Sequence, residues 1–133
     1  MKRKQRETSI QIETQYEGIH YYAGAPSEVA YLRNPHRHIF VVKVEIDVYH
    51  DDRELEFIMM KHTVERWLKE RLDGNGVWQM GPMSCEQVAT QLVDYLESIY
   101  CTNVDRDVIV SVLEDGENGA TVYSYRSVVT EGE

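Results

Sequence analysis

Two stretches near the N-terminus alternate between apolar and polar residues, as β-strands with one buried face do. Residues 8–22 alternate through Ile10, Ile12, Thr14 and Tyr16. Gly18 interrupts this stretch, and we expect a β-bulge just before His20. In residues 36–49 one face carries His36, His38, Phe40, Val42, Val44, Ile46 and Val48. Residues two apart on a strand point to the same side, so the two histidines should extend the apolar face toward covered space.

Two later stretches change to the spacing of amphipathic helices. In residues 58–72 the recurring positions are Met60, Val64, Trp67, Leu68 and Arg71. Gly74 and Gly76 should end this helix. Ser84 is expected to cap a second helix, because Gln87 three residues later completes a capping-box pattern. The inner stripe of that helix is Val88, Leu92, Leu96 and Ile99.

Two further strands are expected at residues 107–114 and 120–128, joined by a turn at 116–119. The order is therefore two strands, two helices, two strands. Because the pattern contains no crossover between parallel strands, it predicts an α+β fold, a four-stranded antiparallel sheet with both helices on one face. Residues 1–133 should form a single domain, with residues 1–7 as a flexible basic tail.

Three histidines have a spacing that suits a metal site. His36 and His38 open the second predicted strand, so both imidazoles should point to one side. His20 ends the preceding strand, and pairing of the two strands would bring it opposite the other two. Three imidazoles leave one position free on a tetrahedral zinc ion, as in catalytic sites. A His-x-His pair is also common by chance, so surface histidines without a metal are the alternative.

Charge and cysteine content exclude some classes of protein. The formal net charge is −9, from 23 acidic and 14 basic residues, whereas proteins that bind phosphate backbones carry a basic surface. We therefore expect no nucleic-acid partner. Cys85 and Cys101 form no CxxC motif, which favours a reducing compartment. No apolar run approaches the roughly 18 residues of a membrane span, and no signal segment opens the sequence, so we expect a cytoplasmic protein without a membrane partner.

Several motifs, in order along the chain, resemble the family of 6-pyruvoyltetrahydropterin and 6-carboxytetrahydropterin synthases. That family has a histidine after a first strand, a loop, and then His-Gly-His-aromatic at the head of a long strand. Residues 16–20 (YEGIH) and 36–40 (HRHIF) are similar to these two parts. Residues 83–86 (MSCE) resemble the Pro-Thr-x-Glu start of the second helix, and residues 112–114 (VLE) resemble the strand whose final glutamate anchors the pterin ring.

The resemblance implies a tunnelling fold of ββααββ order, a zinc ion held by the three histidines, and a pterin or purine-like ligand. Glu114 would accept two adjacent N–H groups of a pterin or guanine edge, as a carboxylate accepts arginine. A solvent-exposed acid at a strand end is the alternative. Ser84 and Glu86 would bind the same ligand, although a plain helix cap is the commoner role of such a serine. The family forms rings, such as hexamers, with sites at subunit interfaces, so a homo-oligomer is implied.

Two departures from the family pattern concern catalysis. The family places a cysteine nucleophile or base four residues before His-x-His, where this chain has Leu32. The family's Asp-His pair after the first helix is reduced to Asp73, which Gly74 follows. Asp73 is therefore one catalytic candidate. Cys85 is a second, since a helix start can lower the pKa of a thiol, and a buried inert cysteine is the alternative.

Three functions remain open from the sequence. The first is a zinc-dependent, carbon–oxygen lyase-like enzyme that acts on a pterin triphosphate or related heterocycle, in queuosine or tetrahydropterin biosynthesis. The second is a non-catalytic protein that binds or sequesters a pterin, a guanine derivative or a nucleotide. The third is a structural oligomer with neither metal nor ligand. The complete set of three histidines places the first ahead, whereas the missing cysteine and histidine favour the second.

Overall fold

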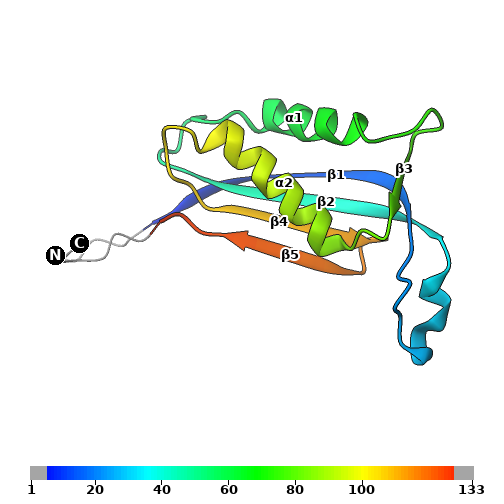
Figure 1. Ribbon diagram of the computed structural model, residues 1–133. Helices are drawn as coiled ribbons and strands as arrows, with labels where there is room; N and C mark the ends of the chain where they lie inside the picture. Colours follow the sequence, from blue (N-terminus) through cyan, green and yellow to red (C-terminus); the bar gives the residue numbers. More distant parts are fainter. Residues whose placement is uncertain (1–5, 128–133) are drawn as a thin grey trace.

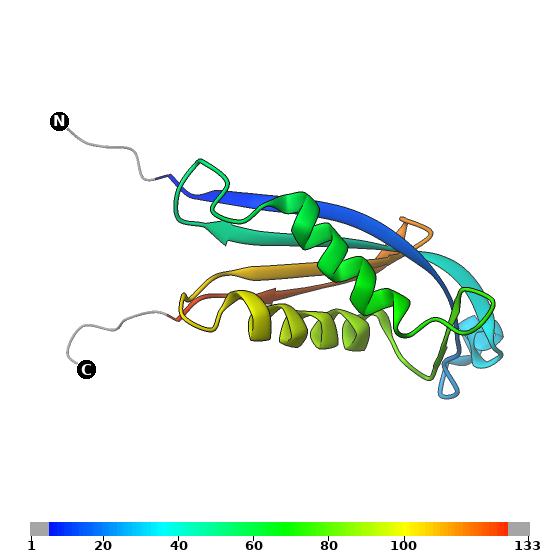
Figure 2. The same ribbon diagram turned by 90° about the horizontal axis from the view of Figure 1, so that it is seen from above.

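The computed structural model describes residues 6–127, which form a five-stranded sheet in the order β3-β1-β2-β4-β5 (Figure 1). The strands are β1 (Thr8–His20), β2 (His36–Val48), β3 (Val77–Gly81), β4 (Val108–Glu114) and β5 (Asn118–Ser124). The helices are α1 (Phe57–Lys69) and α2 (Cys85–Tyr100), and a 3-10 segment, η1 (Ser27–Arg33), lies between β1 and β2. Figure 2 shows both helices across the same face of the sheet. The α+β fold with its helices on one face is thus confirmed.

Strand β3 corrects the prediction of a four-stranded, wholly antiparallel sheet of ββααββ order. It lies between the two helices in sequence and pairs in parallel with β1, from Glu17 opposite Val77 to His20 opposite Gly81. Helix α1 lies on the path from β2 to this edge, which is the crossover that parallel pairing requires. The strand has only five residues, of which Val77, Trp78 and Met80 are buried, so its stability depends on packing more than on its own alternation.

The β-bulge expected just before His20 corresponds to an irregularity in the pairing of β1 with β3, where the register shifts between Ile19 and His20. The pairing of β1 with β2 runs without interruption from Thr8 opposite Val48 to His20 opposite His36. Gly18 is required by close packing, because a Cβ atom there would lie 2.7 Å from Met80 Sδ and 2.9 Å from Phe40 Cε2.

The other element boundaries shift by a few residues. Helix α1 ends at Lys69, so Arg71 lies beyond it. The guanidinium of Arg71 packs over the Trp67 ring, 3.6 Å from its centroid. The last strand ends at Ser124, and its predicted end, Val128, is outside the described residues. Most of the predicted basic tail is also outside them. No helix within residues 6–127 is long and apolar enough to span a membrane.

The core fills the space between the sheet and the two helices, and it is built mainly from the central strands β2 and β4 and from both helices. Fully buried side chains come from both layers: Phe40, Val42, Ile46, Val108, Val110, Val112, Met60, Val64, Val88, Leu92 and Leu96. Helix α2 begins with the predicted capping box, in which the Gln87 N–H donates to Ser84 Oγ over 3.2 Å and the Ser84 N–H donates to Gln87 Oε1 over 3.0 Å. This packing fixes the ends of β1, β2 and β4, where the candidate site lies.

Candidate metal centre and cavity

The three histidines meet at one end of the sheet, where β1 ends and β2 begins. The ring centroids are 4.5 Å apart for His20 and His36, 5.1 Å for His36 and His38, and 5.9 Å for His20 and His38. Strand β4 ends at the same place and brings Glu114 to the cluster. One nitrogen of each imidazole and one oxygen of this carboxylate all lie within 4.8 Å of one another. We call this end of the sheet, which carries His20, His36, His38 and Glu114, the cavity end.

Each imidazole uses its Nδ1 atom in a contact that orients the ring. His20 Nδ1 lies 3.0 Å from the carbonyl oxygen of Met83, and His36 Nδ1 lies 2.9 Å from that of Asn34. A carbonyl oxygen only accepts, so both Nδ1 atoms carry the hydrogen. His38 Nδ1 lies 2.7 Å from Asp115 Oδ2. Nδ1 is therefore occupied in all three rings, which leaves each Nε2 as the atom available to a metal.

A buried nitrogen tests whether these residues suit a metal ion. His20 is 7% exposed, and among residues 6–127 its Nε2 atom has no hydrogen-bond partner. The nearest charged atom is Glu114 Oε1, 2.9 Å away but not oriented for a hydrogen bond, and Glu114 Oε2 lies 3.4 Å from His38 Nε2. A nitrogen lone pair facing a carboxylate oxygen is repulsive unless a cation lies between them. Two ligand atoms about 2.1 Å from a tetrahedral zinc are about 3.4 Å apart. The imidazole nitrogens lie within 4.8 Å of one another, so small side-chain shifts would bring all three onto one ion.

The floor of the cluster is apolar. Phe40 is completely buried, and the rings of His20 and His38 pack edge-on against it at centroid distances of 5.2 and 5.8 Å. Arg37, between the paired histidines, forms an ion pair with Glu17. Its charge is therefore neutralised by β1, and the guanidinium does not oppose a cation at the cluster.

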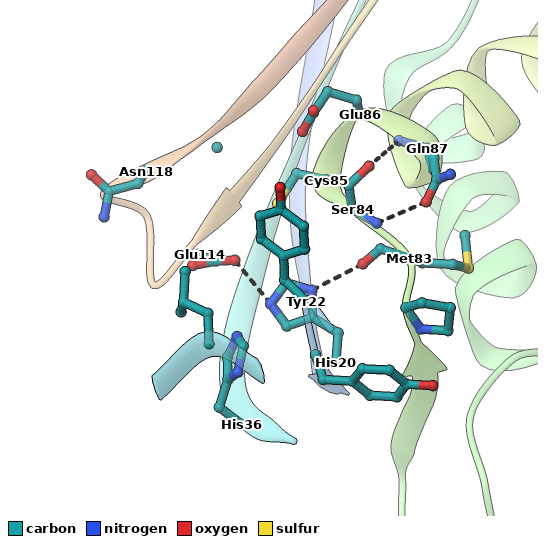
Figure 3. A pocket seen from close by; sticks show the side chains of 14 residues that line it. His20, Tyr22, His36, Met83, Ser84, Cys85, Glu86, Gln87, Glu114 and Asn118 are labelled. Carbon is teal, nitrogen blue, oxygen red and sulfur yellow. Dashed lines mark hydrogen bonds and ion pairs between the residues drawn. The ribbon is translucent and has the colours of Figure 1, made fainter. Parts of the chain in front are cut away.

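A cavity of about 570 Å³ opens beside the histidines (Figure 3). Its walls come from β1, the β1–β2 connection, the start of α2 and the end of β4, and they include Tyr22, Leu32, Ser84, Glu86, Glu114 and Asn118. In Figure 3 His20 lies between Glu114 and Met83, and the Tyr22 ring extends across the cavity in front of the start of α2. The volume lies in the usual range for small-molecule sites.

The structure brings most of the predicted ligand-binding residues to this cavity. Ser84, Glu86 and Glu114 line it together with His20 and His36. Ser84 Oγ already accepts one hydrogen bond as the cap of α2, so its remaining polar capacity is the hydroxyl hydrogen and one lone pair. Cys85 also lines the cavity, but burial, followed by the nearby Glu114 and Glu86 carboxylates, raises the pKa of its thiol to about 12. At neutral pH this side chain is a thiol and not a nucleophilic thiolate.

Asp73 is not among the residues that line the cavity. It lies in the turn before β3, where one carboxylate oxygen accepts the N–H groups of Asn75 and Val77. The other accepts the Gln79 side-chain amide, and these hydrogen bonds, led by that of Gln79, lower the pKa of Asp73. The carboxylate thus stabilises a turn in this chain, and a catalytic role for it stays a prediction.

Three contributors to the site were missed in the sequence. Tyr22 was taken as the end of a strand, although an aromatic residue two positions after a candidate ligand is a detectable signal. The Met83 carbonyl and the Asp115 carboxylate contact histidines 63 and 77 residues away in the chain. No periodicity reveals such contacts, because they depend on how β3 and β4 are placed.

Comparison of the sequence with protein families and with curated proteins gives no match. Among solved structures, this chain is similar to 6-pyruvoyl tetrahydropterin synthase from Plasmodium falciparum, with a TM-score of 0.63 and 14% sequence identity. The alignment covers 90% of this chain and 98% of that one. The chain therefore has the fold of a 6-pyruvoyl tetrahydropterin synthase, and the resemblance drawn from the motifs is confirmed for the fold.

Proposed function

We propose that this protein is a zinc-dependent, 6-pyruvoyl- or 6-carboxytetrahydropterin synthase-like carbon–oxygen lyase that acts on a pterin triphosphate or related heterocycle. One observation carries the proposal: three imidazoles, each with its Nδ1 atom occupied and its Nε2 atom left for a metal, cluster with Glu114 beside a ligand-sized cavity. His20, His36 and His38 would hold the metal. A bound zinc ion would polarise an oxygen of the ligand side chain.

The cavity offers the complementary half of such a site. Glu114 would accept the paired N–H groups of the pterin ring, since its two oxygens can receive two parallel hydrogen bonds. Glu86 and the Ser84 hydroxyl lie on the same wall and would bind other polar atoms of the heterocycle. Tyr22 would cover one face of a flat ring, because an exposed aromatic side chain in a cavity offers a stacking surface.

A second candidate function is binding without catalysis. It is favoured by the absence of an evident base among the cavity-lining residues other than the proposed ligands: Leu32 replaces the family's cysteine, and the pKa of the Cys85 thiol is about 12. A positioned acid or base contributes about 10²–10⁴-fold to a rate, so a protein without one would retain a ligand instead of converting it. A neighbouring subunit could supply the base if the chain assembles as a ring.

The two candidates are separated by one assay. Protein purified without chelator is analysed for transition metals and then incubated with a pterin triphosphate, while inorganic triphosphate and the pterin products are measured. The lyase proposal expects about one zinc per chain and triphosphate release that stops when the metal is removed and returns when zinc is restored. Tight pterin binding without turnover would favour the sequestering protein, and absence of metal after reconstitution would contradict both the zinc site and the lyase.

Replacement of Glu114 tests the anchor. In Glu114→Gln an amide N–H takes the place of one acceptor, so one ligand donor is left unpaired at a cost of roughly 1–3 kcal/mol or more. We expect calorimetric titration to show binding of a pterin or guanine derivative to wild type and at least a tenfold loss in the variant. Glu117→Gln is the control, since it removes the same charge from the following turn. Equal binding by Glu114→Gln would exclude Glu114 as the anchor.

We further propose that the chain forms a homo-oligomeric ring. The sheet has an open edge at β5 and a second along the part of β1 that β3 does not cover, and bare edges invite pairing with another copy. Light scattering would show an assembly larger than a dimer, and a concentration-independent monomer would contradict the proposal. Both cysteines are free, which supports a reducing, cytoplasmic location.

A further inference from the structure

We propose that Asp115 is a positioning residue for the metal centre: its carboxylate fixes the tautomer of His38 and strengthens that ring as a ligand. The inference rests on the proposed metal site and extends it to a residue outside the cluster of potential ligand atoms. The ring of His38 has no carbonyl partner for Nδ1 like those of His20 and His36. Its Nδ1 atom lies 2.7 Å from Asp115 Oδ2.

Asp115 is attached to β2 by three contacts that all involve His38 or its neighbour. Beside the contact of Oδ2 with the imidazole, Asp115 Oδ1 accepts the Ile39 N–H over 3.1 Å. The Asp115 N–H in turn donates to the Ile39 carbonyl over 2.6 Å. Both carboxylate oxygens are thus used, and the one that faces the imidazole cannot rotate away without breaking the bond to the backbone.

The backbone at Asp115 is in the left-handed region, with φ of 54°, and Gly116 follows with φ of 72°. This turn, in which the Glu117 N–H donates to the Glu114 carbonyl over 2.9 Å, places Glu114 in the cavity and Asp115 behind the histidine. Asp-Gly and Asn-Gly are both favourable in turns with two left-handed residues. Turn geometry alone therefore accounts for Asp115 as well as it would for asparagine, and only the charge distinguishes the proposal from a purely structural role.

The charge matters because the three imidazoles then differ. His20 and His36 donate to neutral carbonyl oxygens, whereas His38 donates to a carboxylate. A carboxylate behind a ligand imidazole raises the basicity of the nitrogen that faces the metal, and loss of such a partner typically lowers metal affinity 10–100-fold. Asp115 also contributes negative charge close to the three ligands, which favours a divalent cation over an empty site.

The test compares Asp115→Asn with Glu117→Gln, which removes one negative charge from the same turn without touching His38. Both proteins and wild type are stripped of metal and titrated with zinc against a chromophoric chelator. We expect Asp115→Asn to bind zinc about 10–100-fold more weakly than wild type. Glu117→Gln should stay within about twofold. The thermal unfolding of metal-free Asp115→Asn should match wild type, because Asn-Gly preserves the turn and the metal-free His38 ring can change tautomer to accept a hydrogen bond from the new amide.

A spectroscopic readout separates positioning from folding. With cobalt in place of zinc, Asp115→Asn should shift the visible absorption bands that report the ligand field, and Glu117→Gln should not. If wild type binds zinc and Asp115→Asn binds it equally well with the same cobalt spectrum, the inference is overturned while the proposed metal centre stands. If wild type itself binds no metal, both are overturned.

Discussion

The two ends of the sheet both bury polar side chains, but they satisfy them in different ways. At the end opposite the cavity, which we call the far end, Arg106 is 6% exposed and Asp47 is 8% exposed. Arg106 Nη1 lies 2.5 Å from Glu54 Oε1 and donates to the Asp47 carbonyl, while its Nε donates to the Tyr100 carbonyl. The Asp47 carboxylate accepts the Asp107 N–H and pairs with Arg126 at 3.2 Å.

At the cavity end the buried group is His20, and its partners do not close the network. One nitrogen is satisfied by a carbonyl, and the other faces a carboxylate oxygen without a hydrogen bond. At the far end Glu54 Oε1 also lacks an oriented hydrogen bond among residues 6–127, but it lies against the Arg106 guanidinium, so the opposite charges neutralise each other. The cavity end gathers acceptors around a common space, an arrangement that only an added cation or donor completes. A network of paired opposite charges indicates a structural role, and a converging set of acceptors without a cation indicates a binding site.

Arg106→Met gives the largest expected loss of stability. The substitution removes the cation from a largely buried pair and leaves the Glu54 carboxylate without its partner. We expect the free energy of unfolding to fall by about 3 kcal/mol. This is the lower end of the usual range, because the Glu54 side chain is 19% exposed. Urea unfolding followed by circular dichroism measures this loss. Arg53→Met is the control, because the Arg53–Asp52 pair is more than 80% exposed on both sides and should contribute less than about 1 kcal/mol. Equal losses in the two variants would contradict the contrast.

His20→Ala should have the opposite character. We expect zinc affinity to fall by more than about 100-fold, since loss of a ligand exceeds the effect of losing a partner behind one. The free energy of unfolding of the metal-free protein should change less than it does in Arg106→Met, because removal of an unpaired buried nitrogen offsets part of the lost packing. Competition with a chelator measures the zinc affinity, and urea unfolding measures the free energy of unfolding. His62→Ala, on an exposed position of α1, should alter neither.

Gly18→Ala tests whether packing beneath the cavity end is as tight as the structure indicates. The added methyl group would press on Met80 and on Phe40, whose ring supports His20 and His38, so we expect a loss of about 1–3 kcal/mol in the free energy of unfolding. Gly74→Ala is the matched control, because a Cβ atom there meets nothing within 4 Å. An unchanged unfolding midpoint for Gly18→Ala would show that β1 can shift away from β3 at no cost.

Asp73→Asn gives the smallest expected effect and tests whether Asp73 is structural in the manner of the far end. Because folding lowers the pKa of Asp73, its carboxylate stabilises the folded state above the unfolded pKa of about 3.9. That contribution disappears as the pH falls below this value. The melting temperature of wild type should therefore exceed that of the variant at pH 6, and the difference should shrink toward pH 3. Asp94→Asn, at an exposed position of α2, is the control. A melting-temperature difference that does not depend on pH, or one that appears for Asp94→Asn and not for Asp73→Asn, would contradict this assignment.

Much of the fold follows from local patterns because those patterns correspond to local contacts. The alternation in β1, β2 and β4 and the capping box of α2 appear as predicted, since each depends on neighbours in sequence. Strand β3 does not, because five residues carry too little periodicity and its stability comes from pairing with β1 and burial of Trp78. The irregularity expected just before His20 appears, but in the pairing with β3. The glycine itself is required by close packing of Gly18 against Met80 and Phe40.

The candidate site divides along the same line. Strand periodicity predicts that His36 and His38 share one side, and the register of β1 with β2 brings His20 opposite His36. The carbonyl of Met83 and the carboxylate of Asp115 could not be predicted, because tertiary structure alone brings them to the rings. The hydrogen-bonded turn around Asp73 could not be predicted either, because the motif gives only the distance of Asp73 from a helix along the chain.

The parallel pairing of β3 also bears on the order in which the chain folds. Strands β1 and β2 are joined by residues 21–35, and β4 and β5 by an even shorter turn, so these antiparallel pairs close small loops. Met83 reaches His20 across 63 residues of chain, and the β3–β1 pairing beside it closes a loop of similar size. Long loops lose more entropy on closure, and contacts of this kind tend to form late. We therefore expect a refolding chain to regain most of its sheet before it can bind a metal or heterocycle, so that ligand binding marks the last stage of refolding.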